Sequence, residues 1–380
     1  MLQKIRCASL ARAACHSSVL SVLGLSAVAA LAAAPAQAQD SPRESRETGA
    51  EHHAMARAHA RPPANFDPLS ASDAELAQFG YPPRPDAQTA PDRYALWKKL
   101  VTAPQHRLEP ALEHTTIHNG RAHLVSPRGG GAPALARNAR AGIANSAANV
   151  TTMNWSGYAV VDAQNPFQSG TTVYGEWVVP VAQQRAGTCT GTWSYSSEWV
   201  GIDGFTSSDV LQAGIEVDAF CGNGSTMAFY GAWYEWYPDV ETRITNLQIA
   251  PGNIIGVEVW NSGPTQGNAY IVNYTTQKSV SLAFNAPPGT SLVGDSGEWI
   301  VERPEVNGSF AALTHYVAEP FNFCHAAAGA GTYTPGLSPT GTAYAIDMID
   351  DNGNGPTVLS SPNLYGTAAL WFYEPGPAEQ

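Results

Sequence analysis

Hydrophobic and polar residues alternate along the stretch Val210–Asp218, which is the period of a β-strand with two unlike faces. A half-buried strand can have one solvated side, but an amide and two acids carried together are more than solvation requires. We therefore expect one face to pack in a core and the other to form a polar floor around which the chain is organised. The core face would carry Leu211, Ala213, Ile215 and Val217, and the polar floor Val210, Gln212, Glu216 and Asp218.

From residue 151 to residue 380, short runs rich in Val, Ile, Tyr and Trp are broken by Gly, Pro, Asn and Ser. These 230 residues are enough for one well-filled core, and they contain no repeat of fixed period. The pattern predicts an all-β domain, either a sandwich or a barrel. We expect strands at Trp155–Val161, Thr172–Val179, Glu198–Ile202, Val210–Ala219, Met227–Tyr237, Asn253–Trp260, Tyr270–Tyr274, Ser279–Phe284, Glu298–Glu302, Ala343–Met348 and Ala368–Phe372.

The first 150 residues differ from the later ones in composition and in the pattern of hydrophobic residues. Lys4, Arg6 and Arg12 precede an apolar, alanine-rich run, and Ala36-Gln37-Ala38 is typical of a cleavage site, so residues 1–38 are expected to be a secretory signal peptide. No segment after it reaches the roughly 20 apolar residues that a membrane-spanning helix needs. We expect a secreted protein, extracellular or periplasmic.

Residues 39–150 contain two helix patterns followed by a linker pattern. The Gly-rich and Ala-rich run from residue 129 to residue 150 predicts an exposed linker. The helix patterns are a capping box with stop residues, formed by Ser72, Glu75, Gly80 and Pro82, and a helix expected from Pro91 to Val101.

Charge divides the chain at the same place. Residues 39–150 hold 13 Lys and Arg against 11 Asp and Glu, with seven His, whereas residues 151–380 hold 4 against 21, with two His. So acidic a domain repels nucleic acid and anionic membranes, so we expect neither as a partner. Residues 39–150 are either a disordered extension, as their composition allows, or a propeptide attracted to the acidic domain and removed at the linker.

Cysteine and histidine narrow the chemistry. Cys189 and Cys221 flank two strands around the polar floor, and we expect a disulfide between them, which leaves Cys324 free. The domain has too few His for a usual catalytic zinc site and no nucleophile elbow of the Gly-x-Ser-x-Gly kind. The acidic run Asp347–Asn352 could bind calcium, although a solvated acidic turn is the commoner explanation. We expect no metal and no other cofactor, so the chemistry must come from acids and amides.

Three further stretches would add such groups to the polar floor. Alternation joins Trp199 with Asp203, Trp233 with Glu235 and Tyr237, and Glu298 with Glu302. A Trp-rich strand alone is more typical of a core, and one Glu among aromatics is often structural. The coincidence of four such strands instead favours a cleft for an extended polymeric substrate.

Three functions are compatible with this cleft. Two same-face carboxylates beside aromatic rings suit a glycosidase. A peptidase could use one Glu to activate water and an amide to polarise the carbonyl. Exposed aromatics alone could make a carbohydrate-binding module. The signal peptide and removable segment favour the peptidase.

Five motifs in order resemble those of the glutamic peptidases, or eqolisins. They cover nearly all of the second part of the chain, whereas the pro-segment is similar only in kind. The resemblance implies a secreted, pepstatin-insensitive acid endopeptidase made as a proenzyme. It also implies an antiparallel β-sandwich of two curved, concanavalin-like sheets with the cleft on the concave face. The motifs are Asn154-Trp155-Ser156-Gly157, Trp199-Val200-Gly201-Ile202-Asp203-Gly204, Leu211-Gln212-Ala213-Gly214, Trp233-Tyr234-Glu235-Trp236-Tyr237-Pro238 and Glu298-Trp299-Ile300-Val301-Glu302.

By motif position, the resemblance implies that Gln212 and Glu302 are the catalytic pair. Glu302 would act as general base and then protonate the leaving nitrogen, while the Gln212 amide donates to the oxyanion. Glu216 and Gly231 stand where the best-known member has Asp. The implied substrate-binding residues are Trp199, Asp203, Glu216, Glu235 and Tyr237.

The resulting organisation is a signal peptide at 1–38, a propeptide with linker at 39–150 and a peptidase domain at 151–380. We expect a monomer whose partners are polypeptide substrates and its own propeptide. Protonation of the domain's carboxylates below about pH 4 should weaken its hold on the propeptide and open the linker to cleavage.

Overall fold

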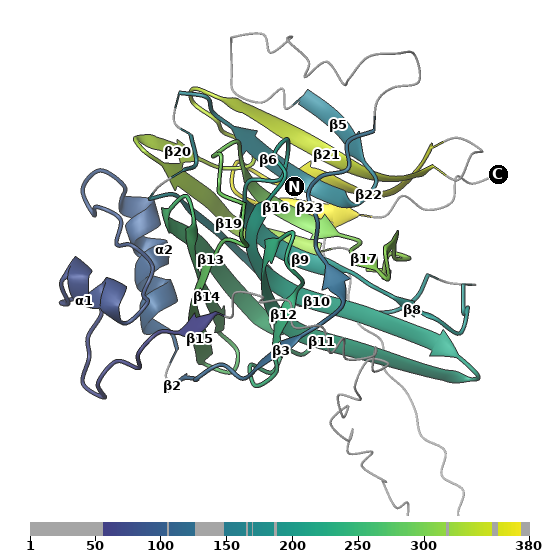
Figure 1. Cartoon of the computed structure of the whole chain (residues 1–380), viewed down its shortest axis with the longest axis horizontal. Coiled ribbons are helices and arrows are strands. Elements are labelled where there is room, and N and C mark those ends of the chain that lie inside the picture. Colours follow the sequence, from purple (N-terminus) through teal and green to yellow (C-terminus); the bar gives the residue numbers. More distant parts are fainter. Residues whose placement is uncertain are drawn as a thin grey trace, which may run out of the picture. The chain divides into compact units, whose positions relative to one another are not determined.

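The structure is a computed structural model that describes residues 56–104, 106–125, 148–164, 166–168, 170–185, 188–316, 319–351 and 356–373 (Figure 1). All of them belong to one unit of the chain, residues 38–380. The expected signal peptide and most of the expected linker, residues 129–147, lie outside the described residues. The linker prediction is wrong for residues 148–150, which begin strand β5 (Ala148–Thr152). Two helices and 23 strands are formed within the described ranges.

The first sheet is antiparallel apart from β5, which pairs in parallel with β21. Short strand β8 (Trp193–Ser194) also pairs with β10. The order across the sheet is β3 (Leu112–His114), β12 (Thr242–Ile244), β11 (Ser225–Tyr237), β10 (Val210–Gly222), β9 (Ser197–Ile202), β16 (Gly297–Glu302), β6 (Trp155–Val161), β21 (Thr342–Asp351), and then both β22 (Pro356–Leu364) and β5 (Ala148–Thr152) beside β21.

The second sheet is also antiparallel apart from β2, which pairs in parallel with β15. Strand β22 pairs with β21 of the first sheet and with β23 of the second, so it links the two sheets. The order is β1 (Arg57–Ala58) and β2 (His106–Arg107) beside β15 (Lys278–Asn285), then β14 (Gln266–Asn273), β13 (Ile254–Gly263), β7 (Thr172–Val178), β19 (Glu319–Ala328) and β23 (Leu370–Tyr373), with β20 (Gly331–Tyr333) beside β19.

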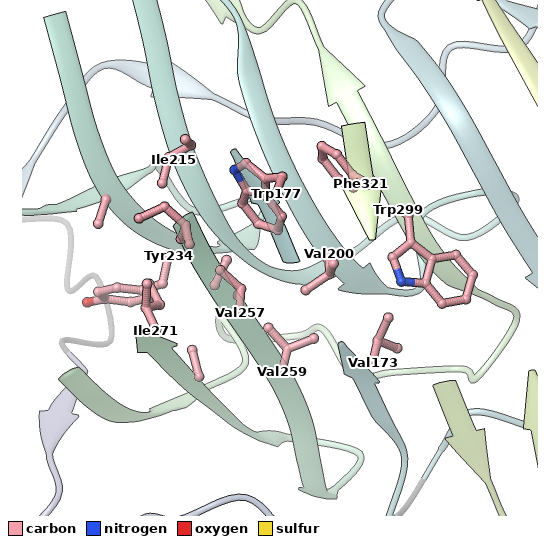
Figure 2. Close-up of a cluster of buried hydrophobic side chains, with 14 of the residues drawn as sticks. Val173, Trp177, Val200, Ile215, Tyr234, Val257, Val259, Ile271, Trp299 and Phe321 are labelled. Atoms are coloured by element: carbon pink, nitrogen blue, oxygen red, sulfur yellow. The ribbon is translucent and has the colours of Figure 1, made fainter. Parts of the chain in front are cut away.

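The inner faces of the two sheets share one hydrophobic core, part of which is drawn in Figure 2. Val200 of β9 and Trp299 of β16 lie in the same cluster as Val257 and Val259 of β13. The predicted core face of β10 is confirmed, because Leu211, Ala213, Ile215 and Val217 all belong to this core and are fully buried. Burial of each large aliphatic side chain contributes roughly 1.5–3 kcal/mol, so this layer holds the sheets together.

The N-terminal segment, residues 56–125, covers the outer faces of both sheets. Helices α1 (Asp73–Gln78) and α2 (Pro91–Thr102) lie on the second sheet (Figure 1), where Leu76, Trp97 and Leu100 pack against Tyr270 and Val272. The predicted capping box is present, because Ser72 and Glu75 exchange hydrogen bonds at the start of α1. The alternative that this part is a disordered extension is therefore wrong for the described residues.

The remainder of this segment crosses the first sheet. Strand β3 extends that sheet beyond β12, and β4 (Ile117–His118) joins β17 (Glu305–Val306) and β18 (Ser309–Phe310) in a small third sheet. Residues 119–125 follow β4 over the outer face of the first sheet, where the polar floor was predicted.

The eleven predicted strands of the domain are all present, with ends that differ by a few residues. Two long strands, β19 and β22, were not predicted, nor were the shorter strands β5, β8, β12, β17, β18 and β20. In β19 the pairing with β7 is interrupted between Asn322 and His325, and Phe323 has a φ of 53°. A bulge of this kind breaks the alternation on which strand prediction depends.

Cys189 and Cys221 form the expected disulfide, and Cys324 is free and buried. The bridge ties the loop before β8 to the end of β10. In the described part of the chain, no helix combines the length and apolar character that crossing a membrane requires.

Candidate active site

The outer face of the first sheet carries a cluster of tryptophans with three polar side chains set among them. Trp155, Trp199 and Trp233 belong to one buried cluster. Gln212 and Glu302 are fully buried, and Glu235 is 1 % exposed. A partly solvated polar face was expected, and this is corrected by the structure, because the N-terminal segment lies on the floor and excludes solvent.

Glu302, at the end of β16, is held by donors from three separate segments of the chain. The Asn154 side-chain amide donates to its Oε1 (2.8 Å), the Trp199 indole donates to its Oε2 (3.0 Å), and the Gly120 N–H donates to Oε1 (3.1 Å). Burial raises the pKa of Glu302 well above the usual value for Glu, while these hydrogen bonds act in the opposite direction. The carboxyl is fixed in orientation and keeps its proton more readily than an exposed Glu.

Gln212 lies on β10, two strands away from β16, and pairs in register with Glu235 of β11. Its side-chain Nε2–H donates to the backbone carbonyl of Asn119. Since the next backbone nitrogen, that of Gly120, donates to Glu302, the two side chains face the two ends of one peptide bond. The structure thus brings Gln212 and Glu302 together across the Asn119–Gly120 bond.

Asn119 enters a pocket lined by acids. Its side-chain amide donates to Glu241 Oε2 (2.9 Å) and Glu235 Oε2 (3.3 Å), and its backbone N–H also donates to Glu235 Oε2 (2.9 Å). Burial raises the pKa values of Glu235 and Glu241 well above those of exposed Glu. Neutral carboxyls are therefore favoured in a pocket that receives hydrogen-bond donors.

Glu216 supports this pocket from one side. Both of its oxygens accept from Arg243, at 2.8 Å and 3.0 Å, and Arg243 also lies 3.6 Å from Glu241. Glu216 was expected to bind substrate, but its contacts are with Arg243, which in turn contacts the acidic pocket. Gly231 is opposite Glu216 in register, and a Cβ there would lie 3.4 Å from Glu216 Oε2.

Asp203, another predicted substrate-binding residue, holds a loop. Its carboxylate accepts backbone N–H groups from Val293 (2.6 Å), Gly294 (3.0 Å) and Asp295 (2.6 Å). Its φ is 71°, and burial raises its pKa to about 8. These contacts fix the loop before β16 and do not place Asp203 beside the Asn119–Gly120 bond.

Three more predicted residues line the floor in different ways. Tyr237 lies beside the segment, since a Cβ on Gly120 would be 3.5 Å from its ring. Trp199 contacts Glu302 directly, as described above. The other acid of β16, Glu298, is buried beside Asp295, Ser296 and Asp203, which are the groups that act on its pKa.

Four residues of the site were not assigned a role from sequence. Asn154 stands in the first of the five motifs, so the sequence singled it out, but the motif gave it no role. Glu241, Asn119 and Gly120 carry no local pattern that distinguishes them, because their roles arise only from contacts distant in sequence. Among the described residues, no group of three or more His, Cys, Asp or Glu side chains is arranged to hold a metal ion.

Comparison with known proteins gives a consistent result. Residues 153–370 match the model of the peptidase A4 family. Aspergillopepsin-2 of Aspergillus niger is 32 % identical over 236 residues, which are 58 % of this chain and 77 % of that protein. Scytalidopepsin B of Scytalidium lignicola is 35 % identical over 113 residues, 30 % of this chain and 41 % of that protein.

Solved structures of similar proteins are also found. A scytalido-glutamic peptidase with a transition state analog inhibitor is 26 % identical, with a TM-score of 0.47, and matches 58 % of this chain and 98 % of that chain. The aspergilloglutamic peptidase from Aspergillus niger is 30 % identical, with a TM-score of 0.41, and matches 48 % of this chain and 99 % of that chain.

Proposed function

Because the chain belongs to the peptidase A4 family and is a glutamic endopeptidase, we propose that it hydrolyses proteins in acid through a dyad of Gln212 and Glu302. Family membership confirms the resemblance drawn from the five motifs. The observation that carries the assignment of the dyad is the peptide bond between Asn119 and Gly120, whose carbonyl and N–H face the two side chains. The cleft would lie on the concave outer face of the first sheet.

In the proposed reaction, Glu302 takes a proton from the attacking water and then delivers it to the leaving nitrogen. The donor at its Oε1 from Asn154 and the donor at its Oε2 from Trp199 keep the carboxyl aimed at the bond. A general acid–base group of this kind contributes typically 10²–10⁴-fold. The Gly120 N–H, which donates to Glu302, occupies the position of the leaving nitrogen.

Gln212 supplies what a carboxylate could not. Its amide N–H donates to the carbonyl oxygen and strengthens that bond as negative charge develops, at any pH. The pocket of Glu235 and Glu241 holds the side chain on the acyl side of the bond, so these two acids are substrate-binding residues. Glu216 acts through Arg243 and is a positioning residue.

The covered state also affects the protonation of Glu302. Burial under the N-terminal segment raises its pKa, and removal of the segment would expose the carboxyl to water and lower the pKa. The covered Glu302 is therefore ionised in a smaller fraction of molecules, and only the ionised form can accept a proton from water. The precursor would be inactive toward other proteins because the segment fills the cleft, and the smaller ionised fraction would slow any reaction at the covered dyad.

Residues 39–150 are proposed to be the propeptide and linker. Lys99 of α2 forms an ion pair with Glu176, so the segment contacts the acidic domain through opposite charges. Acid should weaken this attraction and open the linker to cleavage. We also propose that residues 1–38 direct secretion and that the mature enzyme is a monomer.

The decisive experiment is a casein digestion between about pH 2 and pH 7 with and without pepstatin. We expect hydrolysis on the acid side that pepstatin does not reduce. Cleavage or binding of a β-glucan together with intact casein would support the carbohydrate alternative and overturn the peptidase assignment. Full inhibition by pepstatin would instead point to a pair of aspartates.

A further inference from the structure

The segment that crosses the active site is fixed in register on both sides of the dyad. Before it, Ile117 and His118 pair with β17. After it, the Ala122 N–H donates to the Gly204 carbonyl (2.9 Å), and Asn154 brackets the chain by donating to the Arg121 carbonyl (3.1 Å) and accepting from the His123 N–H (2.9 Å). Strand-like pairing at both ends prevents the chain from sliding through the cleft.

This register presents one particular bond to the dyad. Gln212 donates to the carbonyl of Asn119, and Glu302 accepts the N–H of Gly120. The Gly120 carbonyl, one residue further along the chain, accepts a hydrogen bond from the Trp155 indole (2.9 Å). This contact lies on the leaving-group side of the bond. Among the described residues, neither the His118–Asn119 bond nor the Gly120–Arg121 bond has its carbonyl in contact with Gln212 and its N–H in contact with Glu302.

The Asn119 side chain adds a further element of recognition. Its amide donates to both Glu235 and Glu241, which are buried. A segment that only blocked the cleft would not need a side chain matched to the pocket on the acyl side of the bond. The arrangement instead has the parts of a bound substrate: a recognised side chain, a polarised carbonyl and a nitrogen facing the proton carrier.

We propose that the precursor cuts its own Asn119–Gly120 bond within the same molecule. Water adds to the Asn119 carbonyl carbon and gives its proton to Glu302, and the C–N bond then breaks as Glu302 returns that proton to the Gly120 nitrogen. The products are an Asn119 carboxyl group and a Gly120 amino group. The proposal rests on the proposed function and goes beyond it by naming the bond.

This cut would separate the helices from the domain. Residues 39–119, with α1, α2 and β1 to β4, would become a separate fragment, and loss of Asn119 would free the acidic pocket and Gln212. Residues 120–150 would stay attached to the domain until the linker is cleaved. Maturation would then take two cuts, and Gly120 would be the first new N-terminus.

The test uses the purified precursor, transferred from neutral pH to about pH 3.5 and sampled over time by intact mass and N-terminal sequencing. We expect the earliest new N-terminus to read Gly-Arg-Ala-His-Leu, with a rate constant that does not change over an about ten-fold range of precursor concentration, as for an intramolecular step. The Glu302→Gln precursor should not produce this terminus.

Two substitutions at one position give a matched control. Gly120→Ala keeps the N–H that faces Glu302, and its Cβ would meet Tyr237 at no less than 3.5 Å, an ordinary contact. Gly120→Pro removes that N–H and leaves a prolyl bond. The alanine variant should be cut before residue 120, and the proline variant should not.

Casein hydrolysis in the same samples separates failure of the inference from failure of the function. If acid-treated precursor digests casein, Glu302→Gln abolishes digestion, and every early terminus lies elsewhere, the inference is wrong and the peptidase dyad stands. A Gly120 terminus that forms with a first-order rate constant proportional to precursor concentration, as for cleavage by a second molecule, also overturns it. If no variant or wild type digests casein, the proposed function fails and the inference fails with it.

Discussion

The N-terminal segment covers the outer faces of the two sheets in opposite ways. On the second sheet, Trp97 and Leu100 of α2 are buried against Tyr270 and Val272, an apolar contact. On the first sheet, the backbone around Asn119 and Gly120 lies on Gln212, Glu235 and Glu302, and the contacts are hydrogen bonds. One segment thus has an apolar half and a polar half.

The difference separates attachment from recognition. Apolar burial is non-directional and scales with area, so it provides affinity without fixing one register. Hydrogen bonds require short distances and alignment, so they fix which bond faces the dyad. The helices hold the segment on the domain, and the polar crossing determines what the dyad can act on.

The largest effect should come from the dyad itself. Glu302→Gln should lower casein hydrolysis by about 10²–10⁴-fold, because the general base is lost, and Gln212→Ala by about 10²–10³-fold, because the oxyanion donor is lost. Glu298→Gln is the matched control on the same strand and face and should lose much less. Circular dichroism checks that each variant is folded. Greater loss from Glu298→Gln than from Glu302→Gln would move the base to Glu298.

The next effect concerns buried acids near the two parts of the N-terminal segment, namely the helices on the second sheet and the polar crossing on the first. Burial raises the pKa values of Asp203 in the first sheet's site and Glu258 under α2 to about 8. A raised pKa means that the native state binds more protons than the unfolded state, so this stability is present in acid and is lost as pH rises toward about 8. We expect the melting temperature of the precursor to fall between about pH 5 and pH 8.

Glu258→Gln should flatten that fall, since each unit of pKa displacement corresponds to about 1.4 kcal/mol. Glu109→Gln, in an exposed position of the N-terminal segment, is the control with the same change of charge. A melting temperature that rises from pH 5 to pH 8 would contradict the assignment of raised pKa values.

Trp97→Ala tests the apolar contact between α2 and the second sheet. Trp97 is 2 % exposed, and its truncation should weaken packing by about 3–5 kcal/mol. We expect hydrogen exchange and protease cleavage in α2 to increase, while the sheets keep their protection. Lys98→Ala, exposed on the same helix, should change neither. Equal loss of protection in the sheets would show that the helices are part of the domain's own core.

Asn119→Asp tests the polar contact between the N-terminal segment and the first sheet. It replaces an amide that donates hydrogen bonds by an acid of the same shape. The new group loses the amide donor that faces Glu235 and Glu241. Leaving such buried acceptors without a partner costs about 1–3 kcal/mol, so formation of the Gly120 terminus should slow by roughly 10-fold to 100-fold. Gln88→Glu, exposed elsewhere in the segment, adds the same charge and should have no effect. Equal slowing in both variants would point to net charge alone.

These two contacts of the N-terminal segment also show which structural features could be predicted from the sequence. Alternation in Val210–Asp218 and a capping box at Ser72 depend on neighbours, so both were predictable from a few residues. The entry of Asn119 into the cleft depends on Glu235 and Glu241, which are more than 100 positions away. Asp203 was predicted by alternation to share a face with Trp199, but β9 ends at Ile202 and Asp203 has a φ of 71°, so strand alternation does not extend to it and its carboxylate holds a loop.

The smallest effect should come from a single hydrogen bond to Glu302. Trp199→Phe keeps an aromatic ring but removes the N–H that donates to Oε2. That hydrogen bond lowers the pKa of Glu302, so its loss should raise the acid-side pKa in the profile of kcat/KM against pH by about one unit. Trp233→Phe is the matched control, because Trp233 is equally buried and its indole nitrogen has no hydrogen-bond partner within the described residues. Glu302 would not be the group that titrates if both variants shifted alike or neither did, since only one of the two indoles contacts its carboxylate.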